Sequence, residues 1–383
     1  MKDKPTLQLL LIFICAAIAL LPVNGWSSEK ETAIEAVKTD AAQAVEEAVE
    51  PQEAAEPSFL DLMFFSPNTH ALDAVEKQLN LFSETIKKRF GLYLSRSGKY
   101  LGLMQGILAE KGLPDELAFL PLIESGFSVN AKSPMQAVGP WQFIASTGRL
   151  YGLKINWWVD ERKDPVKSTV AAAEYLSNLY ERFGSWGLAL AAYNAGEGKI
   201  HRALMKAKGS DFWDIQRTSY IKSETRAYVP KFIAATLIAD DPGKYGFDSV
   251  EYEDKFIFEE VAVSGGVPLE EVAKSAGLTV NEIKELNPEL LRACTPPDDK
   301  EYRLRIPVGA KEALIANAPA PSKDCNKYKP VLYTVKKGDT LSGISRKTGV
   351  PINDILHFNS INKRNKKSLI KRGQVLHLSP KRG

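Results

Sequence analysis

The sequence is poor in the residues that build metal centres and disulfide scaffolds. Its 383 residues include three cysteines and four scattered histidines, so a disulfide-rich scaffold is excluded and a zinc site is not expected. The formal net charge of +3 is too small to indicate a nucleic-acid partner by itself. With 44% hydrophobic and 25% charged residues, the chain is neither collagen-like nor wholly disordered. Its length predicts two or three domains, and we expect no metal and no cofactor.

The chain begins with a short apolar run behind two lysines. Leu7–Val23 is apolar apart from Gln8, and the small Gly25 offers a cleavage site before Trp26. This layout is typical of a secretory signal peptide over residues 1–25 and predicts export to the periplasm or the cell envelope. The run of about 17 residues is at the short limit for a membrane span. A signal that stays uncleaved and anchors the protein in a membrane is therefore the alternative.

Charge is distributed unevenly between the two ends of the chain. Residues 29–56 carry nine acidic and two basic side chains, whereas residues 326–383 carry fourteen basic and two acidic ones. The segment 26–58 is rich in alanine and glutamate and lacks aromatic residues after Trp26, which predicts a disordered tether. For the basic end of an exported protein, anionic peptidoglycan stems or a membrane surface are better counterparts than nucleic acid. A solvated face without a partner stays open.

The middle of the chain has the pattern of a helical domain over residues 59–245. Apolar residues recur at helical spacing within Val75–Ile86. Alanine-rich apolar stretches such as Leu188–Tyr193 are typical of closely packed helices. Asp164 before Pro165 predicts a helix N-cap. No sustained alternation of apolar and polar residues predicts strands here.

Two segments after the helical domain are related to each other. Residues 256–308 and 330–379 each show a β segment, two amphipathic helices and a second β segment, and a shift of 72 positions aligns their glycines, asparagines and apolar residues. An internal duplication is the economical interpretation. Residues 309–329, rich in alanine, proline and lysine, are interpreted as a linker. The predicted fold class is therefore α+β and multidomain. Cys294 and Cys325 could form a disulfide or remain thiols.

One carboxylate stands in strongly apolar surroundings. Glu124 ends the apolar stretch Leu120–Ile123 and precedes Ser125-Gly126. Burial among apolar groups raises the pKa of a carboxyl group, as a general acid that works near neutral pH requires. A glutamate that points into water from a helix end is the alternative, and on this feature alone it is the better interpretation.

Two loops could contribute to a site around such an acid. Gly139–Phe143 begins with a Gly-Pro turn, after which Trp141 and Gln142 offer a flat apolar face and an amide, the two groups that a sugar ring needs. A buried tryptophan is the alternative. In Trp157–Pro165, Arg162 could pair with neighbouring acids, and a structural loop with surface ion pairs is the favoured interpretation.

Two helix ends carry further polar side chains. Leu190–Gly198 predicts a helix that ends at glycines directly after Tyr193 and Asn194. In Glu224–Pro230, Tyr228 lies one helical turn from Glu224, where its phenol could bond a carboxyl group. A simple helix end and a core tyrosine are the respective alternatives.

The order and spacing of these segments resemble the soluble lytic transglycosylase family, whose catalytic domain has a lysozyme-like fold. Over about residues 90–240 the resemblance is carried by Glu124-Ser125, Gly139–Phe143, Ala192–Gly196 and Glu224–Val229. The segment Tyr333–Leu341, together with Asn359, resembles a LysM module, which binds glycans that contain N-acetylglucosamine. The copy at 256–308 has Gly266-Val267-Pro268 where the other has Gly338-Asp339-Thr340, so it is interpreted as a degenerate LysM-like repeat.

The resemblance implies a non-hydrolytic cleavage of peptidoglycan glycan strands. Glu124 would protonate the oxygen that bridges N-acetylmuramic acid and N-acetylglucosamine, and would then take the proton of the muramic 6-hydroxyl to give a 1,6-anhydro end. The implied substrate-binding residues are Ser125, Trp141, Gln142, Tyr193, Asn194 and Tyr228, with Tyr228 hydrogen-bonded to Glu124. The implied glycan-binding residues of the LysM module are Gly338, Asp339, Thr340, Leu341 and Asn359. We expect a monomer and leave peripheral membrane association open.

Two other classes of function stay open at this stage. A hydrolysing lysozyme-type enzyme on the same fold would need Asp160, Glu161 or Asp164 to hold a water opposite Glu124, because hydrolysing glycosidases generally use two carboxylates. A non-catalytic wall-binding protein would keep its function without the carboxyl group of Glu124.

Overall fold

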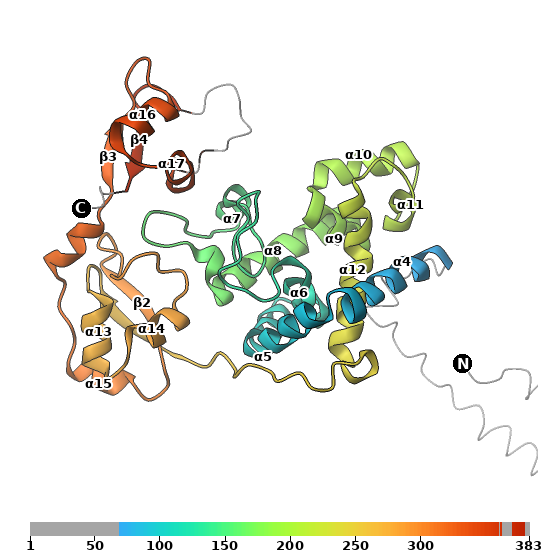
Figure 1. Cartoon of the computed structure of the whole chain (residues 1–383), viewed down its shortest axis with the longest axis horizontal. Coiled ribbons are helices and arrows are strands. Elements are labelled where there is room, and N and C mark those ends of the chain that lie inside the picture. Colours follow the sequence, from blue (N-terminus) through green and yellow to red (C-terminus); the bar gives the residue numbers. More distant parts are fainter. Residues whose placement is uncertain (1–68, 360, 362–369, 380–383) are drawn as a thin grey trace, which may run out of the picture. The chain divides into compact units, whose positions relative to one another are not determined.

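The computed structural model describes residues 69–359, 361 and 370–379 (Figure 1). The predicted signal peptide, the predicted tether and the basic cluster at 363–367 lie outside the described residues. Among the helices of the described part, none combines the length and the apolar character needed to cross a bilayer.

A helical domain occupies the described chain up to about residue 245, as predicted. Its long helices are α5 (Lys87–Glu110), α8 (Pro165–Phe183) and α12 (Ser223–Asp240), and α9 (Trp186–Ala195) packs against α8 and α12. The shorter helices are α4 (Thr69–Asn80), α6 (Leu120–Glu124), α7 (Ala145–Leu150), α10 (Glu197–Ala207) and α11 (Phe212–Gln216). One π turn (Leu81–Thr85) joins α4 to α5, and 3₁₀ turns lie at Asp115–Phe119, Glu161–Lys163 and Gly243–Tyr245.

Helix α9 is the centre of this domain. Residues 186–192 are all buried, and the small size of the glycine and alanine residues among them lets α8 and α12 approach closely. The helix ends at Gly196, whose φ of +91° suits a residue without a Cβ atom. Tyr193 and Asn194 therefore leave the core in the last turn of a rigid helix. Asp164 caps α8, accepting bonds from the backbone N–H groups of residues 166 and 167, which confirms the predicted N-cap.

Two βααβ modules follow the helical domain, which confirms the predicted multidomain α+β class. The first contains β1 (Glu259–Ser264), α13 (Leu269–Ala276), α14 (Val280–Leu286) and β2 (Glu301–Ile306). The second contains β3 (Val331–Thr334), α16 (Leu341–Thr348), α17 (Ile352–Phe358) and β4 (Val375–Leu378). Each strand pair is antiparallel, with Glu259 opposite Ile306 in the first and Val331 opposite Leu378 in the second.

The two modules repeat the same asparagine contact, which confirms the duplication. Asn287 donates from Nδ2 to the carbonyl oxygens of Ile283 and Arg305 and accepts from the Arg305 N–H group. Asn359 makes the same three bonds to Ile355 and His377. In both modules the side-chain amide therefore ties the second helix to the second strand.

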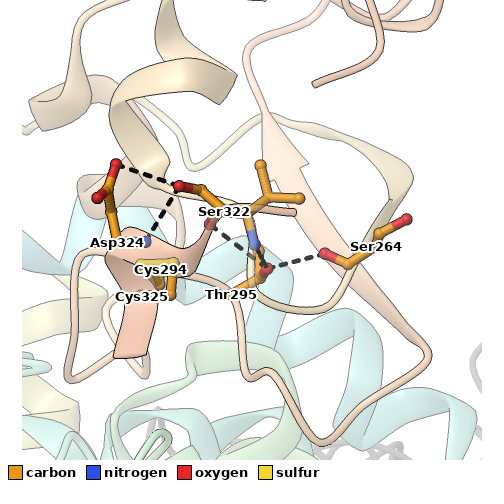
Figure 2. Close-up of a disulfide and its surroundings, with 7 residues drawn as sticks. Ser264, Cys294, Thr295, Ser322, Asp324 and Cys325 are labelled. Carbon is orange, nitrogen blue, oxygen red and sulfur yellow. Dashed lines mark hydrogen bonds between the residues drawn. A yellow bond between two sulfur atoms is a disulfide. The ribbon is translucent and has the colours of Figure 1, made fainter. Parts of the chain in front are cut away.

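The segment 309–329 is folded onto the first module, so the prediction of a linker was wrong. It forms α15 (Lys311–Ala316) and a 3₁₀ turn (Lys323–Tyr328), and the buried side chains of Leu314 and Cys325 join the module's core. Figure 2 shows the disulfide between Cys294 and Cys325 that settles the open question about the two cysteines. Buried side chains, backbone hydrogen bonds such as that from Ser322 to Gly266, and the disulfide hold a segment whose composition is otherwise that of a linker.

The first module also shares its core with the helical domain. Residues 157–159 pack among the buried side chains of the module. The backbone N–H of Leu291 donates to the carbonyl of Trp158, and that of Asp160 donates to the carbonyl of Glu289, both at 2.9 Å. The second module has a separate core, built by its own buried residues.

Candidate active site

Glu124 is the last residue of α6, a short helix whose other residues are apolar. Leu120 and Leu122 lie in the core, while the Glu124 side chain reaches the floor of a pocket. Burial raises the pKa of Glu124 to about 7, and repulsion by Glu224 contributes to this rise. A hydrogen bond from the Tyr228 hydroxyl acts in the opposite direction. The structure thus contains the Tyr228–Glu124 bond that the family resemblance implied.

The pocket has a volume of about 250 Å³ and is lined by residues of α5, α6 and the loops that follow α6. The lining residues are Tyr93, Leu122, Ile123, Glu124, Ser125, Gly126, Ala131, Lys132, Ser133 and Gln142. Among the described residues that line this pocket, Glu124 is the single carboxylate. An acid that is half protonated near pH 7 can both give and take a proton there.

Two tyrosines hold the acid and its loop in place. Tyr228 is buried on α12, and burial together with the charge of Glu124 raises its pKa well above the usual 10, so its phenol keeps its proton. Tyr193 donates to the carbonyl of Trp141 at 2.7 Å, and its pKa is raised in the same way. Of the two, Tyr228 contacts the carboxyl group, whereas Tyr193 fixes the neighbouring loop.

Ser125 and Gln142 line the pocket and also tie its walls together. Ser125 donates from Oγ to the carbonyl of Pro140 at 2.9 Å, which joins α6 to the Gly-Pro turn. Gln142 has a φ of +50°, unusual for a residue with a side chain, and donates from Nε2 to the carbonyl of Gly139 at 2.8 Å. That bond, with a longer one to the carbonyl of Ala131, holds the side-chain amide against the turn.

The structure excludes the predicted contact between the Trp141 ring and a sugar. The ring is 0% exposed, and its Nε1 donates to Thr169 Oγ1 at 2.9 Å. An indole ring that fills the core has no face free for stacking, so the alternative of a buried tryptophan is the correct one. Trp141 instead anchors the turn that carries Gln142.

Two glycines are required by close packing around the acid. A Cβ atom on Gly126 would lie 2.1 Å from the Tyr93 ring, and one on Gly139 would lie 1.8 Å from the carbonyl oxygen of Arg162. Both glycines have positive φ. The second contact presses the Gly-Pro turn against the loop 157–165.

That loop contains buried ion pairs, whereas surface ion pairs were the prediction. Arg162 is 1% exposed and forms a bidentate pair with Asp160 at 2.8 and 2.7 Å. It also donates from Nη1 to the carbonyls of Gln136 and Phe143, both at 3.1 Å. The guanidinium therefore holds both ends of the segment that contains the Gly-Pro turn, a long-range contact that the local sequence does not reveal.

Asn194 lies apart from the carboxyl group, on the neighbouring surface. Its Oδ1 accepts a bond from the Thr225 hydroxyl at 2.9 Å, which joins the end of α9 to the start of α12. Sequence reasoning missed Tyr93, Lys132 and Ser133, which also line the Glu124 pocket. The contact of Tyr93 with Gly126 is set by tertiary packing, and no local pattern marks these residues.

Four of the predicted glycan-binding residues of the second module lie between β3 and the first residue of α16, and Asn359 follows α17, but several serve the fold. Asp339 accepts bonds from the Lys336 N–H group and the Tyr333 hydroxyl, and Thr340 caps α16. Leu341 is buried in the core, and Asn359 is bonded to backbone groups. Gly338 supplies a φ of +87° in the turn.

Comparison with known families identifies three parts of the chain. Residues 99–216 match the model described as the transglycosylase SLT domain. Residues 257–323 match the LysM-like domain of lytic transglycosylase MltD, and residues 333–379 match the LysM domain. The predicted resemblance is thereby confirmed for these segments: one stretch of the helical domain matches the transglycosylase SLT domain, and the two modules that follow match domains of the LysM type.

A longer curated relative is similar to much of the chain. The chain is 32% identical over 297 residues to the membrane-bound lytic murein transglycosylase D of Escherichia coli strain K12. The match covers 73% of this chain and 63% of that protein, so the chain spans less than two thirds of its relative.

Two solved structures are also similar to part of the chain. An inactive variant of the lytic transglycosylase Slt of Pseudomonas aeruginosa is 25% identical, with a TM-score of 0.32, and covers 39% of this chain and 26% of that one. The 70 kDa soluble lytic transglycosylase of Escherichia coli is 24% identical, with a TM-score of 0.35, and covers 48% of this chain and 32% of that one.

Proposed function

We propose that the chain is a peptidoglycan lytic transglycosylase, a lyase that cleaves the β-1,4 bond between N-acetylmuramic acid and N-acetylglucosamine. The observation that carries the proposal is Glu124: a lone carboxyl group in a pocket, held by the Tyr228 hydroxyl, with a pKa of about 7. The match to the transglycosylase SLT domain supports the same assignment.

The reaction needs one group that gives and then takes a proton. Protonated Glu124 donates to the bridging oxygen as the bond from that oxygen to the muramic C1 breaks. The substrate's own acetamido group stabilises the cationic centre at C1. The Glu124 carboxylate then takes the proton of the muramic 6-hydroxyl, whose oxygen bonds to C1. The products are a free N-acetylglucosamine 4-hydroxyl and a 1,6-anhydro end, and Glu124 regains its proton without consuming water.

The state of the other acids supports a lyase over a hydrolase. Asp160 is paired with Arg162, and Asp164 caps α8. Glu161 is bonded to the Lys167 ammonium group and to the Lys154 N–H group. None of these three carboxylates lines the described Glu124 pocket. The second carboxylate that a hydrolysing glycosidase generally uses to direct water has no counterpart there.

The decisive experiment is mass spectrometry of the fragments released from purified sacculi by the full chain. The proposal expects anhydro ends, each lighter by one water than the reducing end that a hydrolase leaves. Glu124→Gln should release no fragments. Release of reducing ends would identify a hydrolase, and an undiminished function of Glu124→Gln would identify a non-catalytic wall-binding protein.

We also propose the division of labour along the chain. Residues 1–25 direct export, 26–58 are the tether and 59–245 cleave the strand, while the module at 330–379 holds the wall through Gly338, Asp339, Thr340, Leu341 and Asn359. The protein then acts in the periplasm or at the envelope. Deleting residues 330–383 should weaken binding to insoluble sacculi and spare cleavage of soluble fragments, because a bound module raises the local concentration of substrate. Loss of both would argue against this division.

A further inference from the structure

A second pocket lies beside the proposed catalytic cleft and is strongly basic. It has a volume of about 320 Å³ and lies between the end of α9, one face of α10 and the start of α12. Four cationic side chains line it, from Lys199, Arg202, Lys206 and Lys222, against the single carboxylate of Glu224. The local excess of three positive charges equals the formal net charge of the whole chain.

The cations converge on the pocket because of helical spacing. Lys199, Arg202 and Lys206 are separated by three and four residues on α10, so they lie on one face. None of the four forms an ion pair with a carboxylate of the described residues; the nearby Glu197 pairs with Arg182 instead. Lys206 lies 5.7 Å from the centre of the Tyr220 ring. Exposed, unneutralised cations at the rim of a concave surface attract an anion.

The basic pocket and the cleft share structure. Asn194 and Thr225, bonded to each other at 2.9 Å, both line the basic pocket. Tyr228, which donates to Glu124, follows Thr225 on the same helix. The charge of Glu224, on the rim of the basic pocket, is close enough to Glu124 to raise its pKa. The first two turns of α12 therefore contribute to both sites.

We propose that this pocket binds the carboxylate groups of the peptide stem on a peptidoglycan strand whose sugars occupy the cleft at Glu124. This inference rests on the proposed function. Stems are attached to the muramic acid units, and they carry free carboxylates, the groups that Lys and Arg side chains recognise. The site would make the enzyme prefer strands that keep their stems over strands that an amidase has stripped.

The first test compares the two kinds of strand with the full chain. For wild type we expect a lower KM on stem-bearing strands than on stripped ones, with the difference shrinking at high salt. The variant Lys199→Gln/Arg202→Gln should lose roughly five- to tenfold in kcat/KM on stem-bearing strands relative to stripped ones, since each exposed pair contributes modestly. The control Lys88→Gln/Arg89→Gln removes two exposed charges of α5 and should leave both substrates unaffected.

The second test measures binding without cleavage. In an NMR titration with a synthetic stem peptide, wild type and the Lys88/Arg89 control should bind alike, and the Lys199/Arg202 variant roughly five- to tenfold more weakly. The same peptide with amidated carboxylates should bind wild type weakly. Equal binding by all three proteins, or equal losses on both kinds of strand, overturns the proposal. If no strand is cleaved by wild type but the titration gives the expected differences, the proposed lyase fails and the carboxylate site stands.

Discussion

Two glutamates buried in different parts of this molecule have similar partners and opposite surroundings. Glu124 accepts a bond from Tyr228, and Glu289, between α14 and β2, accepts one from Tyr302 at 2.7 Å. Burial raises the pKa of both carboxyl groups. Glu124 opens onto a pocket, whereas Glu289 is 2% exposed and faces Arg305. A raised pKa and a tyrosine partner therefore do not distinguish an acid that a substrate can reach from one enclosed in a core. The two are distinguished by whether the carboxyl group lines a pocket.

The surroundings of Glu289 explain its enclosure. Arg305 donates from Nη2 to both carboxylate oxygens of Asp164, at 3.0 and 2.9 Å, and its Nη1 lies 4.0 Å from Glu289. Asp164 is 0% exposed and belongs to the helical domain, while Arg305 and Glu289 belong to the first module. One guanidinium thus faces two buried carboxylates across the shared core: it is hydrogen-bonded to Asp164, whereas Glu289 Oε2 and Arg305 Nη1 have no hydrogen-bond partner among the described residues. All three side chains are buried, whereas Glu124 lines a pocket.

The largest expected effect is the difference in strand cleavage between substitutions of the two glutamates. Glu124→Gln should lower the rate of strand cleavage by about 10³-fold or more, because a general acid is removed. Glu289→Gln should change it by less than about threefold, since Glu289 contacts no substrate. Turnover on soluble strands, with circular dichroism as a check of folding, measures both. A comparable loss in Glu289→Gln would erase the distinction between the two sites.

Removing Arg305 from its buried cluster with Asp164 and Glu289 should lower the free energy of unfolding more than removing an exposed arginine of the same strand. Arg305→Met leaves Asp164 and Glu289 without their cation, so we expect a loss of about 3 kcal/mol or more in the free energy of unfolding. Arg303→Met is the matched control: this side chain is on the same strand, is largely exposed and has a carboxylate at 3.8 Å, and should cost less than about 1 kcal/mol. Urea denaturation of the full chain compares the two; equal losses would contradict the role of Arg305.

Both glutamates should make the free energy of unfolding depend on pH in the same direction. The folded pKa of Glu124 is about 7 against the usual 4.5, so the folded protein binds more protons than the unfolded chain between these values. Stability from this group is present below pH 4.5 and is lost as pH rises through 7. Glu124→Gln removes that loss, and we expect a gain of up to about 3 kcal/mol at pH 8 and little at pH 4.5.

Glu289→Gln should give a similar gain at pH 8, because burial and repulsion by Asp164 raise the pKa of Glu289 to about 7 even with the attraction of Arg305 included. Melting curves of both variants at the two pH values test the pair. A larger gain for Glu289→Gln would show that the enclosed carboxylate is the less compensated one.

The smallest expected effect is that of removing the hydroxyl group of Tyr228, which donates to Glu124. Tyr228→Phe should lower kcat by roughly tenfold, the value of one hydrogen bond that positions the acid. Because that bond lowers the pKa of Glu124, its removal should move the descending limb of the pH–rate profile to higher pH. Tyr302→Phe, the matching change at Glu289, should leave the profile in place. An unshifted profile in Tyr228→Phe would mean that the phenol does not act through the carboxyl group.

Local patterns in the sequence predict much of this structure. The helical domain, the N-cap at Asp164 and the repeated modules follow from spacing and from the shift of 72 positions. The importance of Glu124 follows from its apolar neighbours together with the order of the surrounding motifs. These features depend on residues close together in the chain, where periodicity and capping act.

The features that the sequence did not predict depend on distant partners. From the sequence, the ring of Trp141 could line a sugar site or fill the core. Its hydrogen bond to Thr169, a distant residue, belongs to the core position that the structure shows. The sequence allows Arg162 to pair with a neighbouring acid, but its burial follows from hydrogen bonds to the carbonyls of residues 136 and 143. The fold of 309–329 depends on Leu314 and Cys325, two residues within a segment whose average composition is that of a linker.

The disulfide at Cys325 fixes the start of the connection to the second module. Residues 326–330 alone separate this anchor from β3, and five residues span at most about 20 Å. Under the proposed function, so short a connection would keep glycan binding and glycan cleavage on the same stretch of a strand. Reduction of the disulfide would lengthen the connection and widen that stretch.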